Sequence, residues 1–600
     1  GNAALASNTT ASNNVAVGYN SLTANTTGSE NTAIGQDSLK TNTTAANNVA
    51  VGANSLELNT TGANNTAVGA NSLAANTTAS SNTAVGKNAM NSNTTGTNSV
   101  AVGIQALNTS TTGSSNTACG AFALNDNTTG ASNNAFGESA LANNTTGNDN
   151  NAFGVNCLVT LTTGSNNCSF GRSALGFCTS GSNNAAFGHN ALNKNTTAGS
   201  NTAVGAYTLV NNTTGTTNTA VGSEALNDNT TASNNTAVGS LSLTKNTTGT
   251  SNTATGVNAL RLNTTANDNS AFGFGALQNN TTGSNNTAIG RQALTVNSTG
   301  STNTAVGSLA LDANTTGSEN VAIGYGALTG HSSPEDCVAV GRGALRQGTS
   351  GSNNTAVGAF ALDVCSSNNN TAVGQQSIRN ASSGEGNTAC GAQTLNTCST
   401  GSFNTAIGRQ SLTALTTSDT NTAVGFESGP SVTTGANNLL LGYRAGHTSS
   451  PSGNITTSDN SVCLGNNNIQ NLFCADTSIS SSDSRDKTDV ENFNIGLTWI
   501  EALRPVTYRW DRRTWYGTDA EPYGTPDGSK KRQRLHIGFL AQEALEVEKA
   551  NGYGSSNDDS LVVNLTDDGM SYGMKYERMV PILVNAIKEL SAKVTALEAG

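Results

Sequence analysis

A seventeen-residue repeat fills most of this 600-residue chain and restricts the folds that are open to it. The motif is NTAVG-xx-AL-xx-NTTG-xx, and its glycines recur every seventeen residues from Gly18 to Gly358. After a sixteen-residue step to Gly374 the period resumes to Gly442, and a wider step ends at Gly465, so that twenty-seven glycines lie in register. Strict periodicity of this kind is typical of a solenoid, in which each unit buries its apolar face against its neighbours.

Each unit contains two apolar columns that predict the interior of a coil. In residues 201–205, strand alternation places Thr202 and Val204 on one face and Ala203 on the other. We expect a second short strand around Leu209. The Val204 column holds Val, Ile or Phe in nearly every unit and the Leu209 column holds Leu, so we expect these two columns to fill each coil. The glycine would adopt a backbone conformation that a side chain obstructs, and Asn-Thr-Thr-Gly would form the outer turn.

The nearly invariant alanine column (Ala16, Ala33, Ala50 and Ala67 in the first units) predicts a flat surface. Two strands per seventeen residues enclose little apolar volume, and cores this small are marginal in a single chain. We therefore expect three chains to meet at the alanine face, with Asn and Thr stacked in ladders between coils. The Asn-Thr-Thr triplets also match the glycosylation sequon, but their place in every turn favours a ladder.

The chain has ten cysteines, none of them arranged as a zinc-type CxxC pair. Cys119 and Cys390 take the valine place of the repeat, and Cys463 takes an alanine place. We expect these to be buried small apolar residues, with disulfides between coils or between chains as the alternative.

Composition excludes several classes of function. The net charge is −11 with no basic stripe, so nucleic acid is not an expected partner. No apolar run is long enough to cross a bilayer, so we expect no membrane insertion. No column of His, Asp or Glu recurs in the repeats, so neither a metal nor a cofactor is expected.

Residues 10–445 resemble the left-handed parallel β-roll heads of trimeric autotransporter adhesins, whose repeats carry a similar NxVAIG-type strand. The resemblance implies a mainly β fold, a trimeric parallel β-roll. The period of this chain is slightly longer than is usual in those heads. The resemblance therefore supports the fold better than a bacterial-surface setting.

The composition changes abruptly after the repeats, and all three tryptophans lie in the last 118 residues. We divide the chain into a fibre shaft or head at 1–445, a transition loop and last strand at 446–481, and a small α+β domain at 482–600. Towards the end of the repeats Gly429 and Gly446 occupy the leucine column, so the pattern is expected to decay there.

The C-terminal segment has a conventional globular pattern. We expect helices at 492–503 and 541–549, and strands at 468–480, 506–510 and 535–540. A last helix is expected at 576–599, where apolar residues step by three and four as a heptad seam requires. They are Val580, Leu583, Ile587, Leu590, Val594 and Leu597. This helix either forms a coiled coil of three identical chains or packs on its own domain.

The segments SDSRDKTDV, LRPVTYRW and HIGFLAQEALEV, followed by the last helix, resemble the endosialidase-type intramolecular chaperone domain. That family lies at the C-terminus of phage tail spikes, tail fibres and neck appendages. The resemblance covers 482–600 and implies that the domain trimerises the fibre and then cleaves itself off. The place of Asp486 is often Leu in the family motif, which does not affect the chemistry.

The resemblance implies a catalytic Ser-Lys dyad of Ser482 and Lys487, with cleavage at Ser482-Asp483. A serine hydroxyl is a weak nucleophile unless a neighbouring base accepts its proton, and Arg485 could help a lysine to act as that base. The motif alone would favour a capped turn, with Ser482 or Asp483 as the N-cap and Lys487 solvated, and it is the resemblance of the whole domain that favours self-cleavage. A hydroxyl attacking its own residue's carbonyl would form a four-membered ring, so cleavage after Ser482 needs another group or another chain. An N-to-O shift would instead cut before Ser482.

His536 and Gln542 lie in the HIGFLAQ segment and are candidate supporting residues. They would line the cleavage site or clasp the fibre tip. Each is equally well explained as a structural polar residue.

The sequence therefore predicts a homotrimeric tail or neck fibre of a virion that attaches to a host surface receptor or glycan. Its only enzymatic activity would be a single-turnover self-cleavage, without turnover of a substrate. The alternative is an extracellular cell-surface adhesin with the same chaperone domain. A carbohydrate-active tail spike is disfavoured because the repeats lack paired carboxylates in a recurring pocket.

Overall fold

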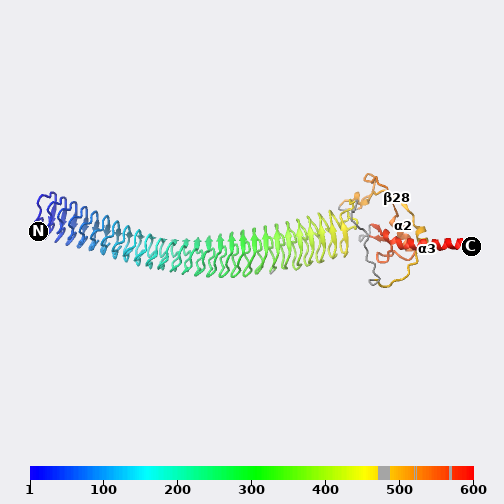
Figure 1. The fold of residues 1–600 in the computed structure, drawn as a ribbon, viewed down its shortest axis with the longest axis horizontal. Coiled ribbons are helices and arrows are strands. Elements are labelled where there is room, and N and C mark those ends of the chain that lie inside the picture. Colours follow the sequence, from blue (N-terminus) through cyan, green and yellow to red (C-terminus); the bar gives the residue numbers. More distant parts are fainter. Residues whose placement is uncertain (350, 470–486, 519–520, 522, 566–570) are drawn as a thin grey trace. The chain divides into compact units, whose positions relative to one another are not determined.

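The computed structural model describes residues 1–349, 351–469, 487–518, 521, 523–565 and 571–600 (Figure 1). The chain forms two compact units, Gly1–Arg342 and Gly343–Gly600. The first unit consists of repeats alone. The second contains the last repeats and the α+β segment.

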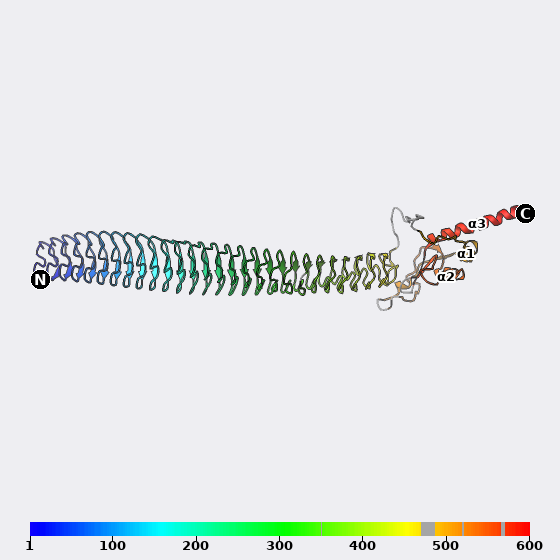
Figure 2. The same ribbon diagram turned by 90° about the horizontal axis from the view of Figure 1, so that it is seen from below.

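The first unit is a parallel β-solenoid, in which the coils stack one on the next from the N-terminus (blue in Figures 1 and 2). Each three-residue strand pairs in register with the strand seventeen residues later, so that Thr202, Ala203 and Val204 oppose Thr219, Ala220 and Val221. The strands are β1 Val15–Val17, β2 Thr32–Ile34, β3 Val49–Val51, β4 Thr66–Val68, β5 Thr83–Val85, β6 Val100–Val102, β7 Thr117–Cys119, β8 Asn134–Phe136, β9 Asn151–Phe153, β10 Cys168–Phe170, β11 Ala185–Phe187, β12 Thr202–Val204, β13 Thr219–Val221, β14 Thr236–Val238, β15 Thr253–Thr255, β16 Ser270–Phe272, β17 Thr287–Ile289, β18 Thr304–Val306, β19 Val321–Ile323 and β20 Val338–Val340. The predicted solenoid is confirmed.

The second strand that we expected around Leu209 is wrong. Leu209 lies in a turn with φ of 50°, in the left-handed region, and a strand cannot continue through that conformation. Its N–H still donates to the carbonyl of Ala225 in the next coil at 3.0 Å, so the turn is hydrogen-bonded between coils. The left-handed conformation recurs in the leucine column, for example at Leu192 and Leu226.

The expected assignment of the two strand faces is also wrong. Ala203 and Leu209 are fully buried, whereas Val204 is 38% exposed. The alanine column therefore faces the inside of the coil and the valine column faces outward. The left-handed turn sends the large leucine side chain into a thin interior, and the strand can contribute only a small residue beside it.

A volume exchange near the end of the repeats supports this assignment. Leu440 takes the alanine place in its strand, and Gly429 and Gly446 take the leucine places on either side. A Cβ atom on Gly429 would lie 2.6 Å from Leu440 Cδ1. The large and small residues have exchanged columns, so the pattern that we expected to decay keeps the interior filled.

The Asn residues of the turns form the predicted ladder. Asn212 is fully buried, and its Nδ2 donates to Asn195 Oδ1 at 3.1 Å and to the Gly215 carbonyl at 2.9 Å. Hydrogen bonds of this kind contribute about 1 kcal/mol each, and an unmatched buried amide would cost more. A glycan could not be attached to an Asn that is enclosed in this way.

The repeat glycine has the conformation that we expected. Gly205 has φ of 133°, and a Cβ atom there would lie 2.7 Å from the carbonyl oxygen of Gly222 in the next coil. A side chain at this position would meet backbone and would also be strained.

The structure separates the cysteines by face. Cys463 is buried as predicted, but Cys119 and Cys390 are exposed because the valine column points outward. The expectation that Cys119 and Cys390 are buried is therefore wrong. Both are free thiols in the described structure.

The second unit begins with solenoid coils of its own and then changes to α+β structure. Its solenoid strands are β21 Thr355–Val357, β22 Thr371–Val373, β23 Thr388–Cys390, β24 Thr405–Ile407, β25 Thr422–Val424, β26 Leu439–Leu441 and β27 Val462–Leu464. The later elements are α1 Leu497–Ala502, β28 Val506–Tyr508, the 3-10 turn η2 Arg513–Trp515, β29 His536–Gly538, α2 Ala541–Ala550, β30 Val563–Leu565, β31 Tyr572–Met574, the 3-10 turn η3 Tyr576–Arg578 and α3 Met579–Glu598. β28 pairs antiparallel with β29, and β30 with β31.

These elements agree with most of the expected helices and strands. The helix expected at 492–503 is wrong in its first half, because the backbone ahead of α1 bonds to α3 instead of forming helical turns. The strand expected at 468–480 lies, from residue 470 on, outside the described residues. A small core joins α1, α2, β30 and α3, and its members are Trp499, Leu503, Ala544, Val562, Val563, Met579 and Ile582.

Candidate functional site

The predicted cleavage motif is only partly described. Ser482, Asp483 and Arg485 lie outside the described residues, and the described chain resumes at Lys487, whose side chain is exposed. The pairing of Ser482 with Lys487 therefore stays a prediction.

The backbone that follows Lys487 is anchored on the last helix. Asn585 Nδ2 of α3 donates to the carbonyl of Phe493 at 2.6 Å and to that of Ile495 at 3.3 Å. The Leu497 N–H, at the start of α1, donates to Glu589 Oε2 at 3.2 Å. In the described structure α1 has no side-chain cap of its own, so Glu589 supplies the cap from another helix.

Gly496 makes this anchoring possible. A Cβ atom on Gly496 would lie within 2.9 Å of the Ala586 backbone nitrogen and would overlap the Glu589 carboxylate. The chain can pass this close to α3 only at a residue without a side chain. Asn585, Glu589 and Gly496 together fix the path of the segment downstream of the predicted cleavage motif.

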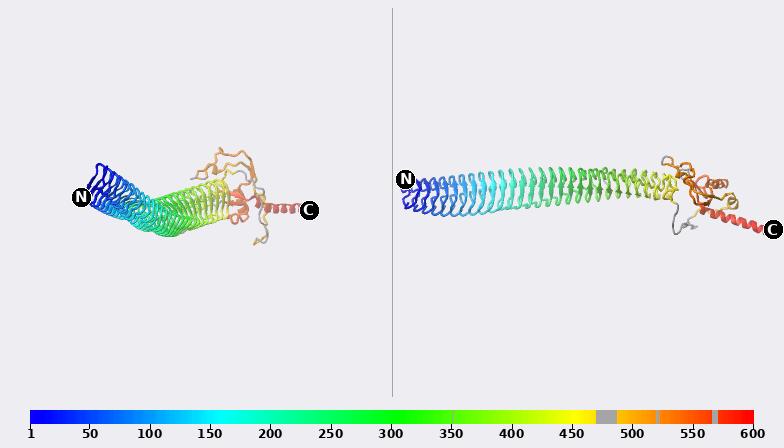
Figure 3. Two further views of the ribbon diagram at one scale, coloured as in Figure 1. Left: turned by 60° about the vertical axis from the view of Figure 1, so that its left-hand side comes forward. Right: turned by 90° about the horizontal axis from the view of Figure 1, so that it is seen from above.

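Helix α3 has two apolar faces with different surroundings. Met579, Ile582 and Ala586 are buried against the rest of the segment. The predicted seam is exposed along its length, for example 65% at Ile587 and 80% at Leu597. The C-terminal half of α3 extends away from the small sheets of its unit (Figure 3). One face of α3 therefore packs on its own segment, as one of the two alternatives expected, and the coiled coil of three chains along the open seam stays a prediction.

The HIGFLAQ segment packs against aromatic residues, one of which lies in η3. The His536 ring stacks on Tyr508 with centroids 5.6 Å apart. The hydroxyl of Tyr576 accepts a hydrogen bond from the Phe539 N–H at 3.2 Å, and a Cβ atom on Gly538 would lie 2.6 Å from that hydroxyl. His536 thus has a structural role in β29, and its predicted role at the cleavage site stays a prediction.

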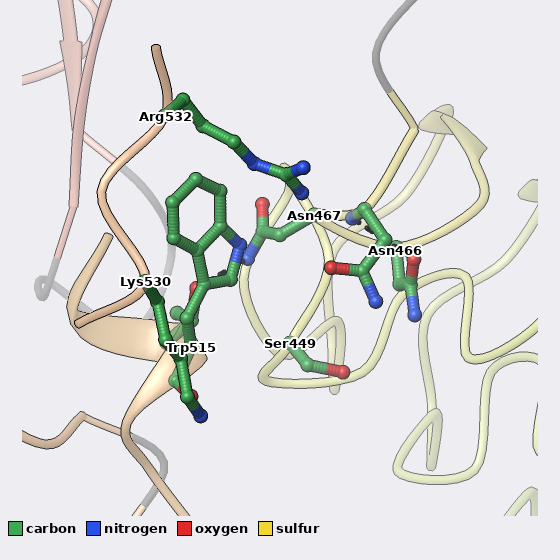
Figure 4. A pocket seen from close by; sticks show the side chains of 8 residues that line it. Ser449, Asn466, Asn467, Trp515, Lys530 and Arg532 are labelled. Carbon is green, nitrogen blue, oxygen red and sulfur yellow. Dashed lines mark hydrogen bonds between the residues drawn. The ribbon is translucent and has the colours of Figure 1, made fainter. Parts of the chain in front are cut away.

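A pocket of about 490 Å³ lies between the end of the repeats and the α+β segment (Figure 4). Asn467 is held there by both sides of its amide: its Nδ2 donates to Thr514 Oγ1 at 3.1 Å, and its Oδ1 accepts from Arg512 Nη1 at 2.8 Å. His536 and Gln542 line two further pockets that each include Asn467. Both predicted supporting residues therefore lie near the last described coil.

A cluster of cations and aromatic rings surrounds these pockets, and the sequence patterns did not reveal it. Arg512 lies over the Trp510 ring at 4.3 Å and Arg532 over the Trp515 ring at 4.8 Å. Burial lowers the pKa of Arg512 from its usual value, and the nearby Arg532 contributes. The available signal was the interleaving of Arg, Trp and Tyr in YRWDRRTWYG.

A buried carboxylate is the other residue that sequence reasoning missed. Glu548 of α2 is fully buried, and its two oxygens accept hydrogen bonds from the Ser560 hydroxyl and the N–H groups of Leu561, Val562 and Val563. These bonds hold the loop before β30 on α2. No pattern in the sequence distinguishes Glu548 from Glu543 and Glu546 of the same helix.

Comparison with known proteins finds a similarity in the C-terminal segment. Residues 482–553 match the sequence model of the family described as chaperone of endosialidase. The match begins at Ser482 and runs through Lys487, β28, β29 and α2. No curated protein matches the chain. The chain thus joins a β-solenoid of 17-residue repeats to a segment that matches the chaperone-of-endosialidase family, and this combination fits a structural fibre.

Two searches of the described residues bear on other functions. Among them, no helix has the length and apolarity to span a membrane. Within the same residues, no group of three or more His, Cys, Asp or Glu is placed to bind a metal ion.

Proposed function

We propose that this protein is a homotrimeric structural fibre whose C-terminal segment brings three chains into register and then separates by self-cleavage. The observation that carries the proposal is the family match at 482–553, which follows directly on a long solenoid. The proposed divisions are a fibre at 1–445, a transition at 446–481 and a chaperone at 482–600.

The repeats create a need for a registering element. Three parallel chains built from near-identical units can associate at many offsets that bury nearly the same surface. A single trimerising segment at one end removes that ambiguity. The exposed seam of α3 supports this role, because a partly exposed Leu or Ile contributes about 1 kcal/mol when it is buried, and the seam offers six apolar side chains.

Self-cleavage would use Ser482 as the nucleophile and Lys487 as its base. The hydroxyl would attack a backbone carbonyl while Lys487 accepts the proton, and the amine of the broken peptide bond would leave with that proton, so that an ester forms on Ser482. Water would then hydrolyse the ester, which releases the carboxylate of the other fragment and restores the hydroxyl. The bond is Ser482-Asp483 if another group or chain takes part, and the one before Ser482 if an N-to-O shift operates. Arg485, His536 and Gln542 would support the site.

The contacts of α3 give a route from assembly to cleavage. Asn585 and Glu589 fix residues 493–497 on the helix that would trimerise. Positioning α3 in a three-chain bundle would therefore also position the backbone leading back to Lys487. Cleavage would then be restricted to assembled chains, and the fibre left behind would be kinetically trapped.

We further propose a virion location, as a tail or neck fibre that attaches to a host surface receptor or glycan. The family's place at the end of phage fibres supports this setting. The resemblance of the repeats to adhesin heads keeps an extracellular surface adhesin as the second candidate.

Intact mass measurement of the purified full-length product tests the proposal. Cleavage after Ser482 yields fragments of 482 and 118 residues, and the exact masses identify which side of Ser482 is cut. Ser482→Ala should stay full length while remaining trimeric by light scattering. Ser484→Ala is the matched control, because it removes the other hydroxyl of the motif and should cleave normally. Efficient cleavage of the Ser482→Ala protein would refute the mechanism.

A further inference from the structure

The outward face of the solenoid in Gly1–Arg342 carries an apolar stripe that nothing else among the described residues of this unit covers. Phe136, Phe187 and Val204 belong to it and are 37% to 38% exposed. Four phenylalanines of consecutive coils, Phe136, Phe153, Phe170 and Phe187, stack with centroids 4.4 to 5.0 Å apart. Contiguous exposed apolar surface of this extent marks an interaction site rather than ordinary surface.

The stripe has the composition of an interface centre. Strands β1 to β20, all within the described residues, contain no charged side chain. Charged residues such as Lys87, Glu138 and Arg172 begin just beyond the glycine that follows each strand. An uncharged centre bordered by a polar rim is typical of protein interfaces.

The two outward positions of each strand, its first and its third residue, compensate each other in side-chain volume. In the five strands of this unit that end in Phe, the first position holds Asn, Asn, Cys, Ala or Ser. In the other fifteen strands the first position is always the β-branched Thr or Val. A face that meets only water has no need of a level surface, whereas a face that packs against another rigid surface does.

The size of the stripe is sufficient for a stable assembly. Twenty strands spaced about 4.8 Å apart extend over about 95 Å, and three residues span about 10 Å across the strand. The resulting area of about 950 Å² per chain exceeds the roughly 800 Å² that one partner contributes to a standard interface.

We infer that this face is the contact surface between copies of this chain, which pack around a common axis in parallel and in register. The inference rests on the proposed homotrimer and assigns its interface to the valine column, in place of the alanine column. A second copy is the occupant that fits, because only a chain with the same coil spacing matches a stripe that repeats at every coil. The phenylalanine block adds to the register that the C-terminal segment sets, since any offset would leave some Phe side chains opposite coils that lack Phe.

Native cysteines on this face provide the test. Cys119 ends β7 and Cys168 begins β10, so both side chains point outward. Oxidation of the full-length trimer with copper phenanthroline should link Cys119 of one chain to Cys119 of another, identified by mass spectrometry of the linked peptides. At most two of three chains can join this way, so the expected product on a denaturing gel is dimer plus monomer.

Matched variants distinguish the interface from the trimer itself. Cys119→Ser should abolish the Cys119 link, and Thr214→Cys added to it, in an exposed outer turn, should not restore a link. Val204→Asp should lower the melting temperature of the trimer, and Thr214→Asp should not. A trimer that links through Thr214→Cys, or in which Cys119 reacts freely with a bulky maleimide, would overturn the inference and leave the trimer standing. Links between Cys119 and Cys168 would overturn the common register, and a monomer by light scattering would refute the proposed function.

Discussion

Enlarging Ala203 tests the most consequential feature of the fold, the inward orientation of the alanine column. Ala203 is fully buried and lies in register between Ala186 and Ala220. Ala203→Val adds two methyl groups to an interior that already holds Leu209. Thr202→Val is the control on the outward face, where Val already occurs in the same column at other coils.

The expected magnitude follows from the rigidity of the coil. The Thr202 N–H bonds to Asn218 O at 2.8 Å and the Gly205 N–H bonds to Phe187 O at 2.7 Å, so the strand is fixed at both ends and cannot move aside. Overpacking of a well-packed core costs about 1 to 3 kcal/mol. In a solenoid the effect should stay local, because each coil contacts only its neighbours. Thr202→Val should change stability by no more than about 0.5 kcal/mol.

Hydrogen exchange on the full-length protein measures this difference locally. Peptides that cover β12 and β13 should exchange about 5- to 150-fold faster in Ala203→Val, which is the rate equivalent of 1 to 3 kcal/mol. Peptides ten coils away serve as an internal reference. Unchanged exchange in Ala203→Val would refute the inward orientation. Dissociation of the trimer by Ala203→Val without faster local exchange would show that the alanine face is the contact between chains.

Two further predictions concern single buried groups. Glu548→Gln replaces one carboxylate oxygen by an NH2 group, which would face the N–H donors of the loop before β30. The substitution should lower the unfolding free energy of the C-terminal segment by about 3 kcal/mol in thermal or urea melts. Glu546→Gln, exposed on the same helix, should be neutral, and equal effects of the two substitutions would contradict the role given to Glu548. Burial raises the pKa of Cys178 to about 11, above its ordinary value near 9. The neutral thiol therefore stabilises the fold below about pH 9. This contribution, up to about 3 kcal/mol, is lost as the pH rises through 11. Hydrogen exchange, corrected for intrinsic rates, should show that the coil of Cys178 opens over this pH range. The coil should not open in Cys178→Asn, which restores the residue usual in that column. Identical pH profiles of the two proteins would contradict the burial of the thiol.

The C-terminal segment shows how far sequence patterns reach. The heptad seam of α3 and the helix at 541–549 follow from spacing that only a helix satisfies. The first half of the helix expected at 492–503 does not form, because Asn585 and Glu589 on a distant helix bind that backbone. The contribution of Glu548 is likewise invisible in sequence, since burial depends on which loop returns to cover α2.

For the repeats, the sequence by itself determined the solenoid, its period and the in-register stacking, because a stacked coil explains twenty-seven glycines that, with two exceptions, follow one another at seventeen residues. It did not determine which strand face points inward. Alternation in a three-residue strand places Ala203 and Val204 on opposite faces, but it does not indicate which of the two faces points into the coil. Only the tertiary structure decided this, through the left-handed turn that directs Leu209 into the coil and leaves room for alanine alone. The same choice leaves Val204 and its column exposed, and so determines which surface remains for other chains.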